Sequence, residues 1–372
     1  MSLLLLAVML ITPFSPVFAV VIDSMGGDTD LTAADIVSED ASKREQFSRH
    51  YLTGDGTYFA VSYAEAVNYQ DEDGNWIPVD NSLSTNILTG EKSTRNEKFK
   101  VKFANKANKD DLVSIQTEDY KVSFGITVSE DGKNYLSLSK VKGTESASNT
   151  SAEPKTTQEA TSLGKAVSGI TYENAFSDYL DVRYSVAHEK VKEDIILQKK
   201  SDFNSYKATY NIKEKDALAT LNEDGSVTFT SPDGAILFTV GAPIMYDAKG
   251  KASADIAVSM VQTKKTVEIT YTPNAEWLNA EDRVYPVTID PTNTSSKATS
   301  NIEDVSFYYM IFSQDDILSE TPYLKIGMDN FTYIKFHTVP TIPAGEILSG
   351  VEMCMNQESV TLCEVRKTNI IY

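Results

Sequence analysis

The stretch Tyr120-Lys121-Val122-Ser123-Phe124-Gly125-Ile126-Thr127-Val128 alternates large apolar residues with small or polar ones. In a β-strand this period of two places the apolar side chains on one face, which is buried, and the others on a face open to water. The same alternation recurs in residues 99–103, 180–186, 206–212, 267–271 and 285–289. Asp-Gly pairs typical of hairpin turns occur at Asp73-Gly74, Asp131-Gly132, Asp224-Gly225 and Asp233-Gly234. No long stretch has helical periodicity, so the sequence predicts an all-β fold of sandwiches or barrels.

The first residues, MSLLLLAVMLITPFSPVFA, have the order of a secretory signal peptide. An apolar run from Leu3 to Ile11 is followed by two prolines and the small-residue pattern Val17-Phe18-Ala19. The run is too short for a transmembrane helix, which needs about 20 apolar residues. We expect cleavage after Ala19 and a secreted protein with no membrane insertion afterwards. A buried N-terminal strand or helix is the alternative.

Polar segments divide the predicted strands. Residues 20–48 are polar and have no hydrophobic pattern, which favours flexible coil. Residues 143–168 contain no aromatic residue, so this segment cannot bury enough surface to offset its ordering entropy. A Thr/Ser/Asn-rich segment at 291–300 marks a further boundary. The predicted organisation is a signal peptide at 1–19, a flexible segment at 20–48, a β-rich region at 49–142, a linker or long loop at 143–168, a β-sandwich-like region at 169–292 and a partial module at 293–372.

The charge and cysteine content limit the function classes. The formal net charge is −19, from 34 Lys and Arg against 53 Asp and Glu. Because phosphate binding depends on clustered Lys and Arg, this balance predicts that nucleic acid is not a partner. The only two cysteines, Cys354 and Cys363, flank a predicted turn. They would form a disulfide across a hairpin outside the cell, or remain two reduced thiols in adjacent strands.

Several blocks of the sequence resemble the N-terminal region of secreted bacterial proteins with DNRLRE-type carbohydrate-binding modules, and wall-associated proteins of the Rhs/YD-repeat kind. The first four blocks are 56–83, 191–197, 241–250 and 277–292. Beyond Pro291, further matching pieces are Asp304-Val305, residues 324–327, Tyr333-Ile334-Lys335-Phe336, residues 340–345 and residues 351–353. The resemblance implies that residues 293–372 are part of a jelly roll, truncated because such a module needs about twice that length.

The same resemblance implies polysaccharide binding. A sugar ring packs its apolar face on an aromatic side chain, while its hydroxyls need polar partners. The candidate carbohydrate-binding residues are Tyr308, Tyr309, Tyr323 and Tyr333, with Lys335 as a polar partner. Ordinary packing within a sheet is the alternative for each of them.

Motifs of catalysis and metal binding are mostly missing from the sequence. There is no His-Glu-x-x-His, no Gly-x-Ser-x-Gly and no phosphate-binding glycine-rich loop. The acidic run 71–75 offers oxygen ligands for calcium, but a solvated hairpin turn is the stronger interpretation. His188 is expected in an exposed polar turn between two strands. We therefore predict no catalytic residues, no metal and no cofactor.

These features together predict a secreted, non-catalytic bacterial surface protein that binds cell-wall or environmental polysaccharide. One alternative is a structural scaffold at the N-terminus of an Rhs/YD-repeat wall-associated or toxin-delivery protein. Another is a polysaccharide-active hydrolase or lyase, since a pair of carboxylates among 53 acidic residues could escape recognition.

Overall fold

The computed structural model describes a large part of the chain and divides it into two compact units. The first unit contains residues 1–79, 151–164 and 299–372, and the second contains residues 80–150 and 165–298. The residues described are 19–23, 35–63, 65–106, 111–130, 134–137, 143–145, 153–160, 163–212, 217–295, 302–308, 316–318, 330–336, 350–357 and 360–362.

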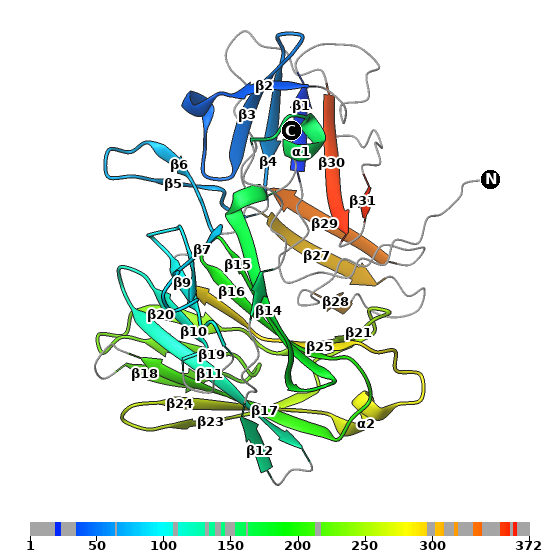
Figure 1. The fold of residues 1–372 in the computed structure, drawn as a ribbon. Helices are drawn as coiled ribbons and strands as arrows, with labels where there is room; N and C mark the ends of the chain where they lie inside the picture. The colour runs from blue at the N-terminus through cyan, green and yellow to red at the C-terminus, as the bar shows by residue number, and fades with distance from the viewer. Residues whose placement is uncertain are drawn as a thin grey trace, which may run out of the picture. The chain divides into compact units, whose positions relative to one another are not determined.

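A nine-stranded sheet forms one layer of the second unit (Figure 1). Its strands are ordered β23-β24-β17-β11-β10-β9-β8-β7, with β12 paired to β11. Their bounds are β7 (Leu83–Thr85), β8 (Lys92–Thr94), β9 (Lys100–Phe103), β10 (Val113–Gln116), β11 (Lys121–Glu130), β12 (Asn134–Ser137), β17 (Phe203–Ile212), β23 (Ile256–Gln262) and β24 (Val267–Pro273).

An eleven-stranded sheet forms the other layer. Its main path is β13-β14-β15-β16-β26-β20-β19-β18, and β25, β21 and β22 branch from β16. Their bounds are β13 (Thr144–Glu145), β14 (Val167–Ser177), β15 (Leu180–Ala187), β16 (Lys190–Leu197), β18 (Leu218–Leu221), β19 (Val227–Thr230), β20 (Ile236–Val240), β21 (Ile244–Asp247), β22 (Ala252–Ser253), β25 (Val287–Asp290) and β26 (Thr292–Ser295). A short helix, α2 (Ala275–Asn279), precedes β25.

Side chains from both sheets fill one hydrophobic core, so the second unit is a β-sandwich. Phe124 of β11 stacks on Tyr210 of the neighbouring β17, with ring centroids 4.9 Å apart. Across the sandwich the same ring meets the edge of Tyr184 of β15 at 6.0 Å. Val122, Ile126 and the other apolar residues of the alternating stretch are also buried. The prediction that this stretch is a core strand is confirmed.

The first unit is also built from antiparallel sheets. A six-stranded sheet has the order β2-β3-β4-β1-β30-β31, a three-stranded sheet has the order β28-β27-β29, and β5 pairs with β6. Their bounds are β1 (Ala19–Asp23), β2 (Ile36–Glu39), β3 (Ser48–Thr53), β4 (Tyr58–Ser62), β5 (Asn68–Gln70), β6 (Trp76–Pro78), β27 (Ile302–Tyr308), β28 (Asp316–Leu318), β29 (Asn330–Phe336), β30 (Gly350–Gln357) and β31 (Val360–Leu362). Short helical turns are η2 (Ala41–Lys43), α1 (Thr157–Ala160) and η3 (Gly164–Ala166), and the sequence boundary between the units falls after Gly164. The all-β fold class is confirmed.

The two units do not follow the boundaries expected from the sequence. Strand β11, from the expected region 49–142, pairs along its length with β17 from the expected region 169–292. Alternation identifies a strand but not its partner, which explains the difference. The segments expected to be flexible also contain order: β2 lies within 20–48, and α1, with Thr157 and Ala160 buried, lies within 143–168. In the described part of the chain, no helix is long and apolar enough to cross a membrane.

Candidate functional site

A cluster of charged side chains surrounds β16, with Lys192 and Asp194 buried and Arg183 and Asp290 partly buried. Lys192 forms ion pairs with Asp194 at 3.0 Å and with Asp290 of β25 at 2.9 Å. Arg183 of β15 binds Asp194 at 2.9 Å. Burial opposes the charged ammonium of Lys192, but attraction to the two carboxylates outweighs it and raises the pKa of Lys192. The cluster is a mutually neutralised set of charges, as a buried site requires.

Glu193 lies next to this cluster in sequence but points to the opposite side of β16, into the core. Its Oε2 accepts a hydrogen bond of 2.7 Å from the Tyr184 hydroxyl, while its Oε1 has no hydrogen-bond partner in the described residues. Burial raises the pKa of Glu193 to about 7, although the bond from Tyr184 lowers it. Perturbed carboxyls of this kind often mark active sites. Glu193, however, is 1% exposed, so a macromolecular substrate cannot touch it.

The accessible candidate is a group of lysines on the outward face of the nine-stranded sheet. In β9 the pattern Lys100-Val101-Lys102-Phe103 places the apolar residues in the core and both lysines outward. Successive outward residues of a strand are about 6.8 Å apart. Lys121, at the start of β11, is exposed on the same face. We call Lys100, Lys102 and Lys121 the lysine triad.

The sheet register brings the triad together. Gln116 of β10 lies opposite both Lys100 and Lys121, so these two lysines are two strand spacings, or about 10 Å, apart. Ser114 likewise lies opposite both Lys102 and Ser123. Serine and glutamine positions of β10 therefore lie on this face between the two strands that carry the triad.

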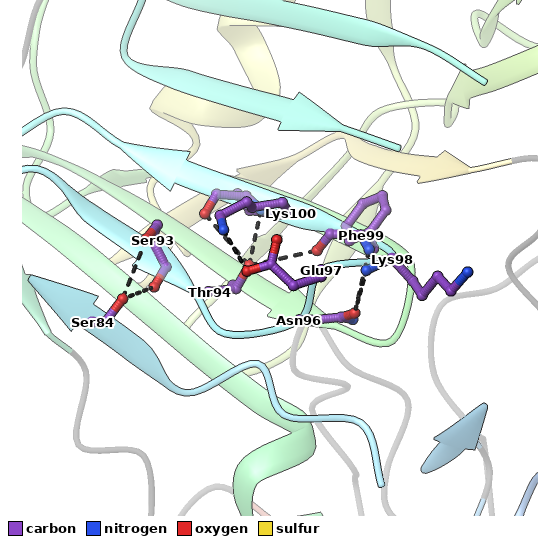
Figure 2. A network of polar contacts seen from close by, with 9 residues as sticks. Ser84, Ser93, Thr94, Asn96, Glu97, Lys98, Phe99 and Lys100 are labelled. Carbon is purple, nitrogen blue, oxygen red and sulfur yellow. Dashed lines mark hydrogen bonds and ion pairs between the residues drawn. The ribbon is translucent and has the colours of Figure 1, made fainter. Parts of the chain in front are cut away.

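The corner between β8 and β9 holds one side of the triad in place, as Figure 2 shows. The Asn96 Oδ1 accepts backbone hydrogen bonds from Lys98 and Phe99, at 3.1 and 3.3 Å. The Thr94 hydroxyl accepts the backbone N–H of Val101 at 2.9 Å. Lys100 pairs with the exposed Glu97 at 2.6 Å. These contacts fix the corner from which Lys100 and Lys102 project.

The local charge of this face differs from that of the whole chain. On β9, β10, β11, β17 and β24, the outward strand positions carry Lys100, Lys102, Lys121 and Lys207 and one acidic residue, Glu268. The flanking turns add Glu97, which pairs with Lys100, and Asp111, which accepts a hydrogen bond from the Ser123 hydroxyl. Glu268 pairs with Lys207 at 3.1 Å. Lysine ammonium, serine hydroxyl and glutamine amide groups are the side chains that contact phosphate oxygens in nucleic-acid complexes. The face can therefore bind a polyanion, although the chain as a whole is acidic.

The structure leaves most of the predicted carbohydrate site undescribed. Tyr309 and Tyr323 lie outside the described residues. Tyr308 lies in β27 opposite Asn330, whereas Tyr333 and Lys335 lie in β29 opposite Val305 and Glu303. That these tyrosines form a platform therefore stays a prediction.

The predicted disulfide is also only partly described. Cys354 lies in β30, and Cys363 lies outside the described residues. Met355 pairs with Leu362, and these are the chain neighbours of the two cysteines. The disulfide and its reduced alternative both stay predictions.

The structure tests the sequence-based predictions for two turns, one at residues 71–75 and one at His188. Asp71 accepts the backbone N–H groups of Asp73 and Asn75 and closes a hairpin between β5 and β6, as expected of a turn. The prediction that His188 lies in a turn between two strands is confirmed, but the prediction that it is exposed was wrong. It does occupy the turn between β15 and β16, with a positive φ of 46°, but it is buried, and burial lowers its pKa to about 4. In the described part of the chain, no group of three or more His, Cys, Asp or Glu residues could hold a metal.

Sequence reasoning overlooked the lysine triad, although part of its signal was present. The alternation of Lys100 and Lys102 with apolar residues is visible in the sequence. The approach of Lys121 depends on the β9-β10-β11 register, which alternation alone does not give. The net charge of the whole chain then concealed a local excess of lysine.

Comparison with known proteins finds relatives among bacterial nucleases. The chain is 25% identical over 323 residues to the protein named tRNA nuclease WapA from Bacillus subtilis strain 168. It is equally similar to the tRNA3(Ser)-specific nuclease WapA of Bacillus spizizenii and the tRNA(Glu)-specific nuclease WapA of Bacillus subtilis subsp. natto. Each alignment covers 82% of this chain but only 13% of the relative. No family model and no solved structure matches the chain.

These relatives correct the functional interpretation of the sequence. They are named tRNA nucleases, not DNRLRE-type or Rhs carbohydrate-binding proteins, so the predicted family was wrong. The functions inferred from it conflict with the same names: polysaccharide binding, the scaffold and polysaccharide-active alternatives, and a non-catalytic protein. The exclusion of nucleic acid as a partner conflicts with these names as well, and it rested on a net charge averaged over the whole chain. Among the matched proteins, the chain is similar to one stretch of much longer tRNA nucleases.

Proposed function

We propose that this chain belongs to a protein that acts on tRNA, and that its lysine triad contacts the tRNA backbone. The observation that carries the proposal is the match of 82% of the chain to three proteins named as tRNA nucleases. The chain spans 13% of their length, so the activity of the whole protein is part of the proposal.

The physical support comes from the outward sheet face. Lys102 forms no ion pair within the described part of the chain, so its ammonium can exchange bound counterions for phosphate. Lys100 is held by the exposed Glu97, an ion pair that solvent screens and a phosphate can replace. The polar groups of Ser114 and Gln116, between the lysines, can donate further hydrogen bonds to phosphate or ribose oxygens. None of these contacts reads a base, so the face is suited to backbone recognition.

The first prediction concerns binding of labelled tRNA to the full chain, measured by fluorescence anisotropy over a series of salt concentrations. The variant Lys100→Gln/Lys102→Gln/Lys121→Gln should bind roughly tenfold more weakly at low salt, and the slope of log K against log salt should fall by about 3. The matched control is Lys199→Gln/Lys249→Gln/Lys251→Gln, which removes the same charge from exposed positions elsewhere in the second unit. It should retain most of the binding.

Gel electrophoresis of the same mixtures scores cleavage of the tRNA. If cleavage occurs, the triad variant should slow it at subsaturating protein by the same factor as it weakens binding. Absence of tRNA binding by the full chain at low salt would contradict the proposal. An equal loss in the two triple variants would remove the triad as the contact surface.

We also propose that the chain is exported. The support is the apolar run Leu3–Ile11 and the cleavage pattern Val17-Phe18-Ala19. Cleavage after Ala19 would leave Val20–Asp23 as the part of β1 that pairs with β4 and β30. Expression in a bacterial host should therefore yield protein in the medium, and N-terminal sequencing should begin at Val20. Intracellular protein that still begins at Met1 would contradict export.

A further inference from the structure

Strand β23 forms one edge of the nine-stranded sheet. In the part of the chain that the structure describes, it pairs with β24 alone and ends the strand order (Figure 1). Its sequence, Ile-Ala-Val-Ser-Met-Val-Gln, contains no charge, proline or glycine. Folded proteins normally protect a long edge strand with such residues or with a covering loop, because its free N–H and C=O groups can recruit another strand.

The hydrogen-bond pattern identifies which backbone groups face away from β24. The Thr263 N–H donates to the Thr266 carbonyl at 2.8 Å, and the Asn274 N–H donates to the Asp255 carbonyl at 2.9 Å. Asp255 and Thr263, which make these contacts, are odd-numbered residues that flank β23 at its two ends. Since hydrogen-bonded pairs alternate along an antiparallel ladder, the odd residues of β23 bond to β24. The N–H and C=O groups of Val258 and Met260 therefore point out of the sheet edge.

The outward side chains of the same strand do not obstruct an approaching strand. Ala257, Ser259 and Val261 are exposed, and Val261 retains 60% of its surface. Val258 and Met260 pack against the core and fix the strand in the sheet. At the far end, the Gln262 side chain accepts from Ala219 N–H and donates to the Ala217 carbonyl. The edge is thus uncharged and, at seven residues, long enough for strand addition.

Charge at the two ends of β23 selects the partner. The exposed Asp255 precedes the strand, and the exposed Lys264 and Lys265 follow it in the turn to β24. When two such strands pair antiparallel, the acidic end of each lies beside the basic end of the other. Parallel pairing would instead place like charges together. The edge is therefore complementary to itself.

We propose that two copies of this chain associate through antiparallel pairing of their β23 strands. The two-fold contact joins the two nine-stranded sheets across the edge, and the outward groups of Val258 and Met260 supply the new backbone hydrogen bonds. Asp255 of each copy pairs with the Lys264–Lys265 turn of the other. The lysine triad is not part of the contact.

The test is sedimentation of the full chain over a wide concentration range, combined with amide hydrogen exchange. The wild type should form dimers as concentration rises. The amides of Val258 and Met260 should become protected only where dimers form, whereas those of Ala257 and Ser259, which bond to β24, should be protected throughout. Ser259→Lys should abolish the dimer, because it places two like charges near the two-fold axis.

Thr270→Lys is the matched control, since Thr270 is the β24 partner of Ser259 and adds the same charge one strand away from the edge. It should leave the dimer intact. Lys264→Glu/Lys265→Glu should weaken the dimer by facing Asp255 with like charge. A chain that stays monomeric, or a dimer that survives Ser259→Lys, overturns the proposal. The proposal is also overturned if the amide exchange rates of Val258 and Met260 do not change with protein concentration.

Discussion

Two buried titratable residues of the second unit have pKa values shifted in opposite directions. Burial raises the pKa of Glu193 from 4.5 to about 7 and lowers that of His188 from 6.5 to about 4. Both shifts favour the neutral side chain in the folded protein. Each pKa difference corresponds to about 3 kcal/mol of linked stability.

The signs of the two effects are opposite. Stability from neutral Glu193 is present below pH 4.5 and is lost as the pH rises toward 7, because the unfolded chain releases its proton first. Stability from neutral His188 is present above pH 6.5 and is lost as the pH falls toward 4, because the unfolded chain binds a proton first. Between these limits the two contributions offset each other.

Single substitutions should therefore reveal a pH dependence that the wild type conceals. At pH 8, Glu193→Gln should have a free energy of unfolding about 3 kcal/mol higher than that of the wild type, and it should therefore unfold at a higher urea concentration. At pH 4 the two proteins should differ little. His188→Asn places at this position a residue that tolerates the positive φ. The folded variant should lose less stability than the wild type as the pH falls from 6.5 toward 4. Urea unfolding at several pH values measures both. Glu223→Gln, at an exposed position, is the control. A Glu193→Gln variant as stable as the wild type at pH 8 would refute the claim that burial raises the pKa of Glu193.

At the scale of single elements, the sequence predicts strands well and their environments less well. The alternation in 120–128 corresponds to a buried strand face, and Gly225 and Gly234 have the positive φ expected of their Asp-Gly turns. The same logic fails at β16, where Lys192, Glu193 and Asp194 are all buried. A strand covered on both faces loses the polar alternation that identifies an exposed one. Its burial depends on neighbours that are distant in sequence.

Two of the blocks that suggested a family signature, 241–250 and 277–292, are explained by local structure. Arg283 donates to Asp247 at 2.9 Å, and its guanidinium lies 3.4 Å from the centre of the Trp277 ring. Asp247 also accepts the backbone N–H groups of Lys249 and Lys251 and so shapes the turn after β21. Removing either partner would leave a buried charge unpaired, which costs several kcal/mol. These residues fasten α2 to the sandwich, and a structural role of this kind carries no information about a ligand.

At the scale of the whole molecule, the chain builds the sandwich from two separated stretches. Residues 80–150 and 165–298 form the second unit, and the intervening 151–164 belong to the first. The hydrophobic core of the sandwich runs from Phe99 to Ile289. The sequence suggested two successive regions because periodicity identifies strands, and composition identifies polar segments between them, but neither shows which strands pair. The long-range pairing of β11 with β17, which joins those regions, lies outside what such patterns contain.

A fragment spanning residues 80–298 should therefore fold alone, whereas a fragment spanning 49–142 should not. The longer fragment keeps the complete core and leaves 151–164 as a surface loop, whose closure costs little free energy. The shorter one exposes Phe124 and Val122, because it lacks β17 and the Tyr184 ring that cover them. Urea unfolding followed by near-ultraviolet circular dichroism should show one cooperative transition for the longer fragment and none for the shorter. A cooperative transition in 49–142 would instead support the regions expected from the sequence, since that stretch would then contain a core of its own.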